Sequence, residues 1–157
     1  MNQIKDQGKT ILVTGGAGFI GSNLIARLLK DNEATQSSPP GKVIVFDSLP
    51  RAQSSNLDEF GSRPDLQWIE GDVRNAKDID SATDGVDQIY HLSSVVGVDR
   101  YMESPLEVID VNVIGTRNIL DSALKKGIQV LFTSTSEVFG KNATTPWTED
   151  ADRVLGS

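Results

Sequence analysis

The chain has 157 residues, 38% of them hydrophobic and 24% charged, which suits one soluble domain. The formal charge of −7 and the scattered basic residues argue against a nucleic-acid partner. The chain has no apolar run near the ~18 residues of a membrane span and no signal-peptide pattern, so we expect no membrane partner and a cytoplasmic protein. With no cysteine and one histidine, disulfides, a thiol nucleophile and a Cys/His zinc site are excluded, and no pattern indicates another metal.

Short β-branched runs alternate with longer helical patterns from one end of the chain to the other. The predicted strands are Thr10–Thr14, Val43–Phe46, Leu66–Glu70, Gln88–Leu92 and Ile128–Thr133. Continuous apolar strands of this kind are typical of a sheet that is covered on both faces. We therefore predict one α/β domain of the Rossmann type, with a doubly wound parallel sheet.

Between the first two strands, "TGGAGFIG" opens a predicted helix over Phe19–Lys30. The spacing fits both Gly16-x-Gly18-x-x-Gly21 and Gly15-x-x-Gly18-x-x-Gly21. Glycines permit the tight turn and the close approach of a pyrophosphate, and the helix directs its free N–H groups at the anion. No Gly-Lys-Ser/Thr follows, which excludes a P-loop.

The polar segment Asp31–Gly41 is predicted to be a surface loop before the second strand, which ends in Asp47. A carboxylate there can bind adenosine ribose hydroxyls and repel a 2′-phosphate, so NAD is favoured over NADP. Arg51 weakens that preference, and Asp47 can also simply close an Asx-turn. Asp72 follows the third strand at the same edge, where Ser93 and Thr135 should also converge.

Two further residues have open interpretations. His91, within the fourth strand, is predicted to be a packed, hydrogen-bonded core residue. The segment "SPLE" predicts an N-cap hydroxyl at Ser104 for one long helix, about Pro105–Lys126, that carries apolar residues on two faces. One face can cover the sheet, and the other is left for further segments of the subunit or a dimer partner. Asn112 in this helix needs partners for its amide.

The order of these motifs resembles the extended short-chain dehydrogenase/reductase family, and within it the NAD-dependent nucleotide-sugar epimerases, 4,6-dehydratases and UDP-glucuronate decarboxylases. The likeness rests on "TGGAGFIGSNL", "VIVFDSL", "GDVRN", "YHLSS", "SPLEVIDVNVIGTRNIL" and "LFTSTSEVFGKN". It departs from the family where "HLSS" replaces paired alanines and Phe139 replaces a tyrosine.

The resemblance implies a role for each site residue. The NAD pyrophosphate would be held by Gly15, Gly18 and Gly21 with the Phe19 and Ile20 amides, and the adenosine ribose would be bound by Asp47. The adenine would lie between Asp72 and Val73, and the cofactor channel would be lined by Leu92 and Ser93. The reaction would pass through a 4-keto sugar, with Thr135 as hydroxyl partner and Ser136 and Glu137 in proton transfer. The residues alone equally allow this serine- and threonine-rich cluster to satisfy loop amides, with Glu137 facing water. The implied partners are a UDP- or dTDP-sugar and, in the parent, a second subunit.

The family's Tyr-x-x-x-Lys pair is not found in these residues. Tyr90 and Tyr101 are followed four positions later by Ser94 and Pro105. We therefore expect residues 1–157 to be the NAD-binding part of a longer enzyme, truncated before the helix with that pair and before the substrate domain, and inactive alone. The alternatives are a stand-alone NAD-binding or regulatory module and a doubly wound methyltransferase.

Overall fold

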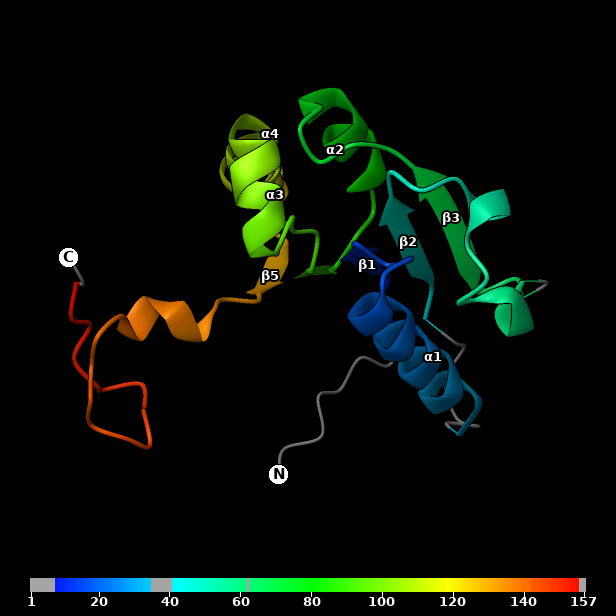
Figure 1. The fold of residues 1–157 in the computed structure, drawn as a ribbon. Helices are drawn as coiled ribbons and strands as arrows, with labels where there is room; N and C mark the ends of the chain where they lie inside the picture. The colour runs from blue at the N-terminus through cyan, green and yellow to red at the C-terminus, as the bar shows by residue number, and fades with distance from the viewer. Residues whose placement is uncertain (1–7, 35–40, 62, 156–157) are drawn as a thin grey trace.

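A parallel five-stranded sheet in the order β3-β2-β1-β4-β5 forms the centre of the computed structural model, which describes residues 8–34, 41–61 and 63–155 (Figure 1). The strands are β1 (Ile11–Thr14), β2 (Val43–Asp47), β3 (Leu66–Glu70), β4 (Gln88–His91) and β5 (Gln129–Phe132). All neighbouring strands are parallel, so their carboxyl ends share one edge. The predicted Rossmann-type fold is confirmed.

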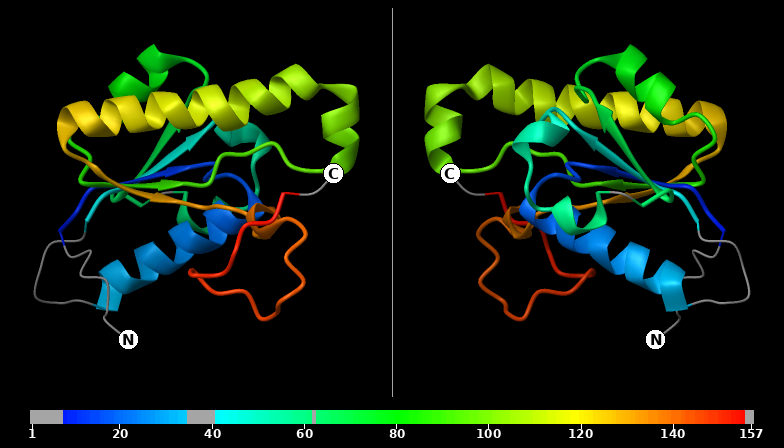
Figure 2. Two further views of the ribbon diagram at one scale, coloured as in Figure 1. Left: turned by 90° about the vertical axis from the view of Figure 1, so that its left-hand side faces the viewer. Right: turned by 90° about the vertical axis from the view of Figure 1, so that its right-hand side faces the viewer.

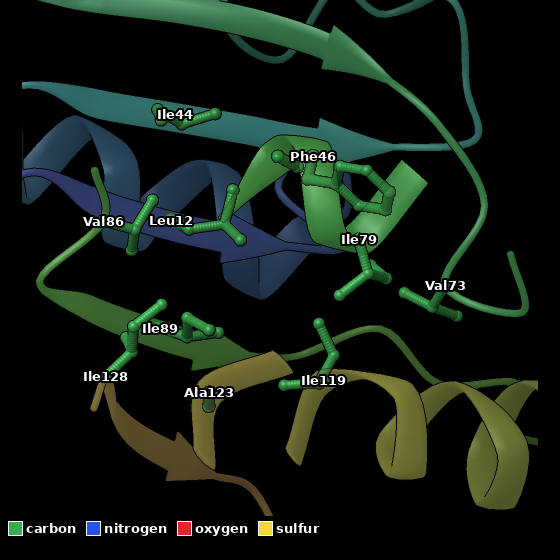
Figure 3. Close-up of a cluster of buried hydrophobic side chains, with 11 residues drawn as sticks. Leu12, Ile44, Phe46, Val73, Ile79, Val86, Ile89, Ile119, Ala123 and Ile128 are labelled. Atoms are coloured by element: carbon green, nitrogen blue, oxygen red, sulfur yellow. The ribbon is translucent and has the colours of Figure 1, made fainter. Parts of the chain in front are cut away.

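Helices cover both faces of the sheet. Helix α1 (Phe19–Ala34) lies on one face, while α2 (Ala76–Ala82) and the long helix that ends at Lys126 lie on the other (Figure 2). Alternate strand residues point to opposite faces. Two buried clusters result: one on the α1 side contains Val13, Ile25 and Val45, and the other joins Leu12 and Ile89 to α2 and the long helix (Figure 3).

The predicted helix over residues 105–126 is continuous but not uniform. It consists of α4 (Pro105–Ile109), a π-helical segment η3 (Asp110–Gly115) and α5 (Thr116–Lys126), and Gly127 ends it in the left-handed conformation with φ of 69°. Ile119 and Ala123 are buried against the sheet. A stripe of apolar side chains is exposed on the same helix: Leu106, Ile109, Val113, Leu120 and Leu124. Both predicted apolar faces are therefore present, and the second is exposed.

Several elements differ from the prediction. Helix α1 continues to Ala34 instead of ending at Lys30, because "DNEA" contains no glycine or proline to stop it. The predicted 31–41 loop therefore starts later, and its positions 35–40 lie outside the described residues. Helices α2 and α3 (Val98–Glu103) were not predicted, since each is short and α3 buries no side chain. Among the described residues, no helix is both long enough and apolar enough to span a bilayer.

Three-residue 3-10 turns, η1 (Arg51–Gln53) and η2 (Asp58–Phe60), lie between β2 and β3, and η4 (Ser136–Phe139) follows β5. Within η2, Phe60 is buried with Leu57 in the α1-side cluster. This turn therefore adds two apolar side chains to the core on the α1 side of the sheet.

Candidate functional site

A cleft of about 290 Å³ opens at the carboxyl edge of the sheet. Its walls come from the segments that follow β1, β2, β3 and β4, together with the first turns of the long helix. The lining residues include seven predicted from the sequence to contact a cofactor: Gly15, Gly18, Asp47, Asp72, Val73, Leu92 and Ser93. The parallel register of the sheet brings these positions together, as the motif order predicted.

The glycine loop forms the floor of the cleft between β1 and α1. Gly15 has a φ of 68°, and a Cβ there would lie 2.9 Å from the Ser93 amide nitrogen, so this backbone directly contacts the segment after β4. The first backbone hydrogen bond of α1 runs from Ser22 N to Gly18 O. The amides of residues 19–21 therefore have no acceptor inside the helix and are available to an anion.

Asp47 lies opposite this helix end. Its carboxylate accepts hydrogen bonds from the Ala17 amide and the Leu49 amide, each at 3.0 Å. The second of these is the Asx-turn considered above, and the carboxylate lines the cleft as well. A carboxylate has about four lone-pair sites, so two amide donors leave capacity for ribose hydroxyls. Arg51 does not line the cleft, because its guanidinium donates to Gly61 O at 2.7 Å.

Asp72 and Arg74, in the segment after β3, form an ion pair in the lining of the cleft. Arg74 Nε lies 3.0 and 2.9 Å from the two Asp72 carboxylate oxygens. The Arg74 side-chain hydrogen bond holds the Asp72 pKa below its ordinary value, although partial burial opposes the shift. Glu107 also lines the cleft and contributes to the raised Arg74 pKa, after the larger effect of Asp72. The predicted N-cap bond at Ser104 is wrong: its side chain makes no capping hydrogen bond.

The segment after β4 is held from two directions. The Leu92 and Ser93 amides donate to Thr14 Oγ1 at 3.2 and 3.3 Å. The Asn112 side chain accepts from the Val95 amide at 2.9 Å and donates to Val95 O at 3.0 Å. Asn112 thus has the amide partners that its place in the helix required, and they belong to the wall of the cleft.

His91 is a buried core residue, as predicted, with 1% of its surface exposed. Its imidazole stacks on Phe132 with ring centroids 5.9 Å apart. Burial lowers the pKa of His91 to about 4, so the ring is neutral at pH 7.

The hydroxyl cluster after β5 lies outside the cleft. Thr135, Ser136 and Glu137 are exposed at the start of η4, and none of them lines the cleft. Thr135 Oγ1 accepts from the Glu137 amide at 3.2 Å, which is the loop-amide role considered above. Thr133 Oγ1 donates to His91 O at 3.3 Å, which fixes the start of the segment to β4.

Sequence reasoning and structure differ over several residues. Phe19, Ile20 and Gly21 do not line the cleft, although their amides lie at the helix end beside it. Glu107 was missed as a lining residue because its position in "SPLE" indicated a helix cap. Asn56, which donates to Ala17 O at 2.8 Å and so supports the glycine loop, gave no sequence signal.

Comparison with known proteins supplies independent information. The sequence model of the NAD dependent epimerase/dehydratase family matches residues 11–154. A UDP-N-acetyl-alpha-D-glucosaminuronate decarboxylase of Bacillus cytotoxicus is 36% identical over 95% of this chain and 43% of its own length. UDP-glucuronic acid decarboxylase 6 of Arabidopsis thaliana is 39% identical over 88% of the chain and 37% of its own length. The chain therefore spans less than half the length of these relatives.

Solved structures show the same fold. A dTDP-glucose 4,6-dehydratase from Streptomyces venezuelae, solved with NAD bound, has a TM-score of 0.80 and 36% identity, over 93% of this chain and 45% of its own. A UDP-N-acetylglucosamine 4-epimerase from Methanobrevibacter ruminantium, in complex with UDP-N-acetylmuramic acid, has a TM-score of 0.79 and 26% identity, over 96% and 46%.

Proposed function

The chain belongs to the NAD dependent epimerase/dehydratase family, and from this premise we propose that its cleft binds NAD for a nucleotide-sugar epimerase, dehydratase or decarboxylase. One observation carries the proposal: the end of α1, whose amides have no acceptor within the helix, lies beside the cleft that Gly15, Gly18 and the Asp47 carboxylate line. Those amides suit a pyrophosphate and the carboxylate suits ribose hydroxyls. The similar dehydratase structure with NAD bound supports the choice of cofactor.

The part of the cleft formed by the segment after β3 suits the adenine. Val73 is buried, and its side chain packs closely on the long helix at Gly115, where an added Cβ would lie 2.6 Å from Val73 Cγ2. This contact holds the segment after β3 against the helix. The Asp72 carboxylate, kept ionised by Arg74, offers an acceptor for an amino group. Leu92 and Ser93 would then line the channel toward the reactive ring.

The chemistry would use the segment after β5. When bound, NAD would accept the hydride from sugar C4 while a base outside these residues takes the proton of the C4 hydroxyl, which would give a 4-keto sugar. The Thr135 hydroxyl accepts the Glu137 amide and so keeps its own proton to donate to a developing sugar oxyanion. Ser136 and Glu137 would move the proton at the adjacent carbon. The names of the relatives support a UDP- or dTDP-sugar as substrate.

Turnover should require residues that these 157 do not supply, because no tyrosine here is followed by lysine at the fourth position. We propose that the parent enzyme is a homodimer that uses the exposed apolar stripe of the long helix. The exposure of Thr135–Glu137 outside the cleft favours the second candidate, an NAD-binding module without catalysis. The product of the complete reading frame, assayed with UDP- and dTDP-sugars, separates the two: sugar conversion supports the enzyme.

Cofactor binding is tested by calorimetric titration of the chain with NAD, NADP and S-adenosylmethionine. We expect NAD to bind most tightly and Asp47→Asn to weaken it about tenfold or more, since hydrogen bonds to a charged acceptor are lost. Asp58→Asn, an exposed acid in η2 outside the cleft, is the matched control and should bind NAD as the wild type does. Preferential binding of S-adenosylmethionine would instead indicate a methyltransferase.

A further inference from the structure

His91 has two hydrogen-bond partners from different parts of the fold. Its Nδ1 lies 2.7 Å from Thr14 Oγ1, at the end of β1, and its Nε2 lies 3.0 Å from Thr116 Oγ1, at the start of α5. The ring therefore joins the root of the glycine loop to the long helix. None of the chemistry proposed above uses it.

The neighbouring bonds determine which nitrogen carries the proton. Thr116 Oγ1 lies 2.7 Å from Asn112 O, and a carbonyl can only accept, so the Thr116 hydroxyl proton points there. Its oxygen is then left to accept from His91 Nε2–H. Thr14 Oγ1 already accepts two backbone amides, so its own proton is directed at Nδ1. The neutral ring must be the Nε2–H tautomer.

This chain of bonds connects both anchors of one cleft wall. The wall starts at Leu92 and Ser93, which are held by the Thr14 hydroxyl, and reaches Val95, which is held by the Asn112 amide. Asn112 lies in the π-helical segment, and its carbonyl accepts the hydroxyl of Thr116, four residues further along the same helix. His91 thus sets the distance between two groups that each fix one end of the wall.

We propose that His91 is a positioning residue of the cofactor cleft, which as an Nε2–H imidazole fixes the 92–95 wall between the glycine loop and the π-helical segment. The inference rests on the proposed cofactor function of this cleft. A ring that accepts on one side and donates on the other is needed, because Thr14 must donate while Thr116 must accept. Rotation or loss of the Thr116 hydroxyl would leave the buried Nε2–H without a partner.

The first test reads the tautomer directly and requires no cofactor. The chain contains a single histidine, so nitrogen NMR of a histidine-labelled sample reports His91 without assignment. At pH 7 we expect the Nε2–H tautomer alone. An Nδ1–H tautomer, an imidazolium or a mixture would overturn the inference whether or not NAD binds.

The second test links the network to the cofactor with two matched variants of α5. Thr116→Val removes the hydroxyl that His91 contacts. Ser122→Ala removes another buried hydroxyl, whose oxygen lies 2.7 Å from Thr83 Oγ1; neither residue of this pair lines the cleft. We expect Thr116→Val to raise the Kd for NAD about three- to tenfold. Ser122→Ala should stay within about twofold of the wild type at a comparable loss in Tm.

Thr116→Ser keeps the hydroxyl and should restore both the tautomer and the affinity. Equal NAD affinity in Thr116→Val and the wild type would overturn the positioning role while leaving the proposed function intact. Equal weakening by Ser122→Ala would also overturn it, because the effect would then be one of general stability. No NAD binding by the wild type would refute the proposed function itself.

Discussion

Substitution by alanine should affect the stability of the fold at Gly21 but not at Gly18, two glycines of the same loop. A Cβ on Gly21 would lie 2.2 Å from Gly15 O and 2.7 Å from Gly16 Cα. Ordinary contact begins at 3.4 Å, so the loop would have to open by about 1.2 Å (3.4 − 2.2). Overpacking of a fixed turn costs about 1–3 kcal/mol, so Gly21→Ala should lower the free energy of unfolding by at least that much.

Gly18→Ala should leave the fold intact. Its Cβ would meet only Gly15 O, at 3.2 Å, which a shift of a few tenths of an ångström relieves. Replacing glycine by alanine also restricts the unfolded chain, which contributes about 0.4–1 kcal/mol in favour of folding. Gly18 nevertheless lines the cleft, where an added methyl group blocks the approach of the pyrophosphate to the backbone.

Urea denaturation and calorimetric NAD titration on both variants distinguish these effects. We expect Gly18→Ala to unfold within about 1 kcal/mol of the wild type but to bind NAD at least about tenfold more weakly, equivalent to about 1.4 kcal/mol. Gly21→Ala should lose both properties. Wild-type NAD affinity in Gly18→Ala would refute the reasoning about pyrophosphate approach, and wild-type stability in Gly21→Ala would refute the packing geometry.

Three further predictions concern stability and association. Burial lowers the His91 pKa from 6.5 to about 4. Between these two pH values the unfolded state binds more protons than the folded state. The free energy of unfolding should therefore fall by on the order of 3 kcal/mol as the pH drops from 6.5 to 4. Urea midpoints measured across that range check this, and His91→Gln should remove the dependence that is due to the imidazole. Ile119→Ala empties a fully buried site and should cost about 2–5 kcal/mol by urea denaturation, whereas Leu124→Ala, at an 84% exposed position, should stay within about 0.5 kcal/mol. Light scattering should show self-association of the chain through the apolar stripe, reduced by the double substitution Leu120→Glu and Leu124→Glu; a monodisperse wild-type monomer would contradict this.

The sequence predicted those features that depend on local pattern. The glycine spacing and the aspartate after the second strand are short-range signals, and the parallel sheet then brings Asp47 and Asp72 to one edge. The long helix with two apolar faces could also be predicted, since its apolar residues recur at helical spacing. The π-helical segment could not be predicted, because no spacing of residue types marks it, and the long-range bonds of its Asn112 to Val95 have no sequence signal either.

Long-range polar contacts account for most of what sequence reasoning missed. His91 was expected to have partners, but Thr14 and Thr116 are separated from it by 77 and 25 positions, and no spacing rule relates them. Glu107 occupies a position that satisfies a capping pattern, yet its carboxylate lies near Arg74 at the cleft. A side chain can thus match a local sequence motif and still make a different contact in the folded structure.

The residues proposed to bind the cofactor and those proposed to act in catalysis lie in different parts of the structure. The cleft is lined by the carboxyl ends of the first four strands with the segments that follow them and by the first turns of the long helix, and hydrogen bonds through Thr14, His91 and Asn112 join these parts. The hydroxyl cluster at Thr135–Glu137, by contrast, is exposed and contributes nothing to the cleft lining. Affinity for NAD should therefore depend on residues before β5, while turnover should depend on those after it. A hydrogen bond from Thr133 Oγ1 to His91 O joins the two sets next to the β4–β5 pairing, and we expect substitutions far from that junction to affect one property more than the other.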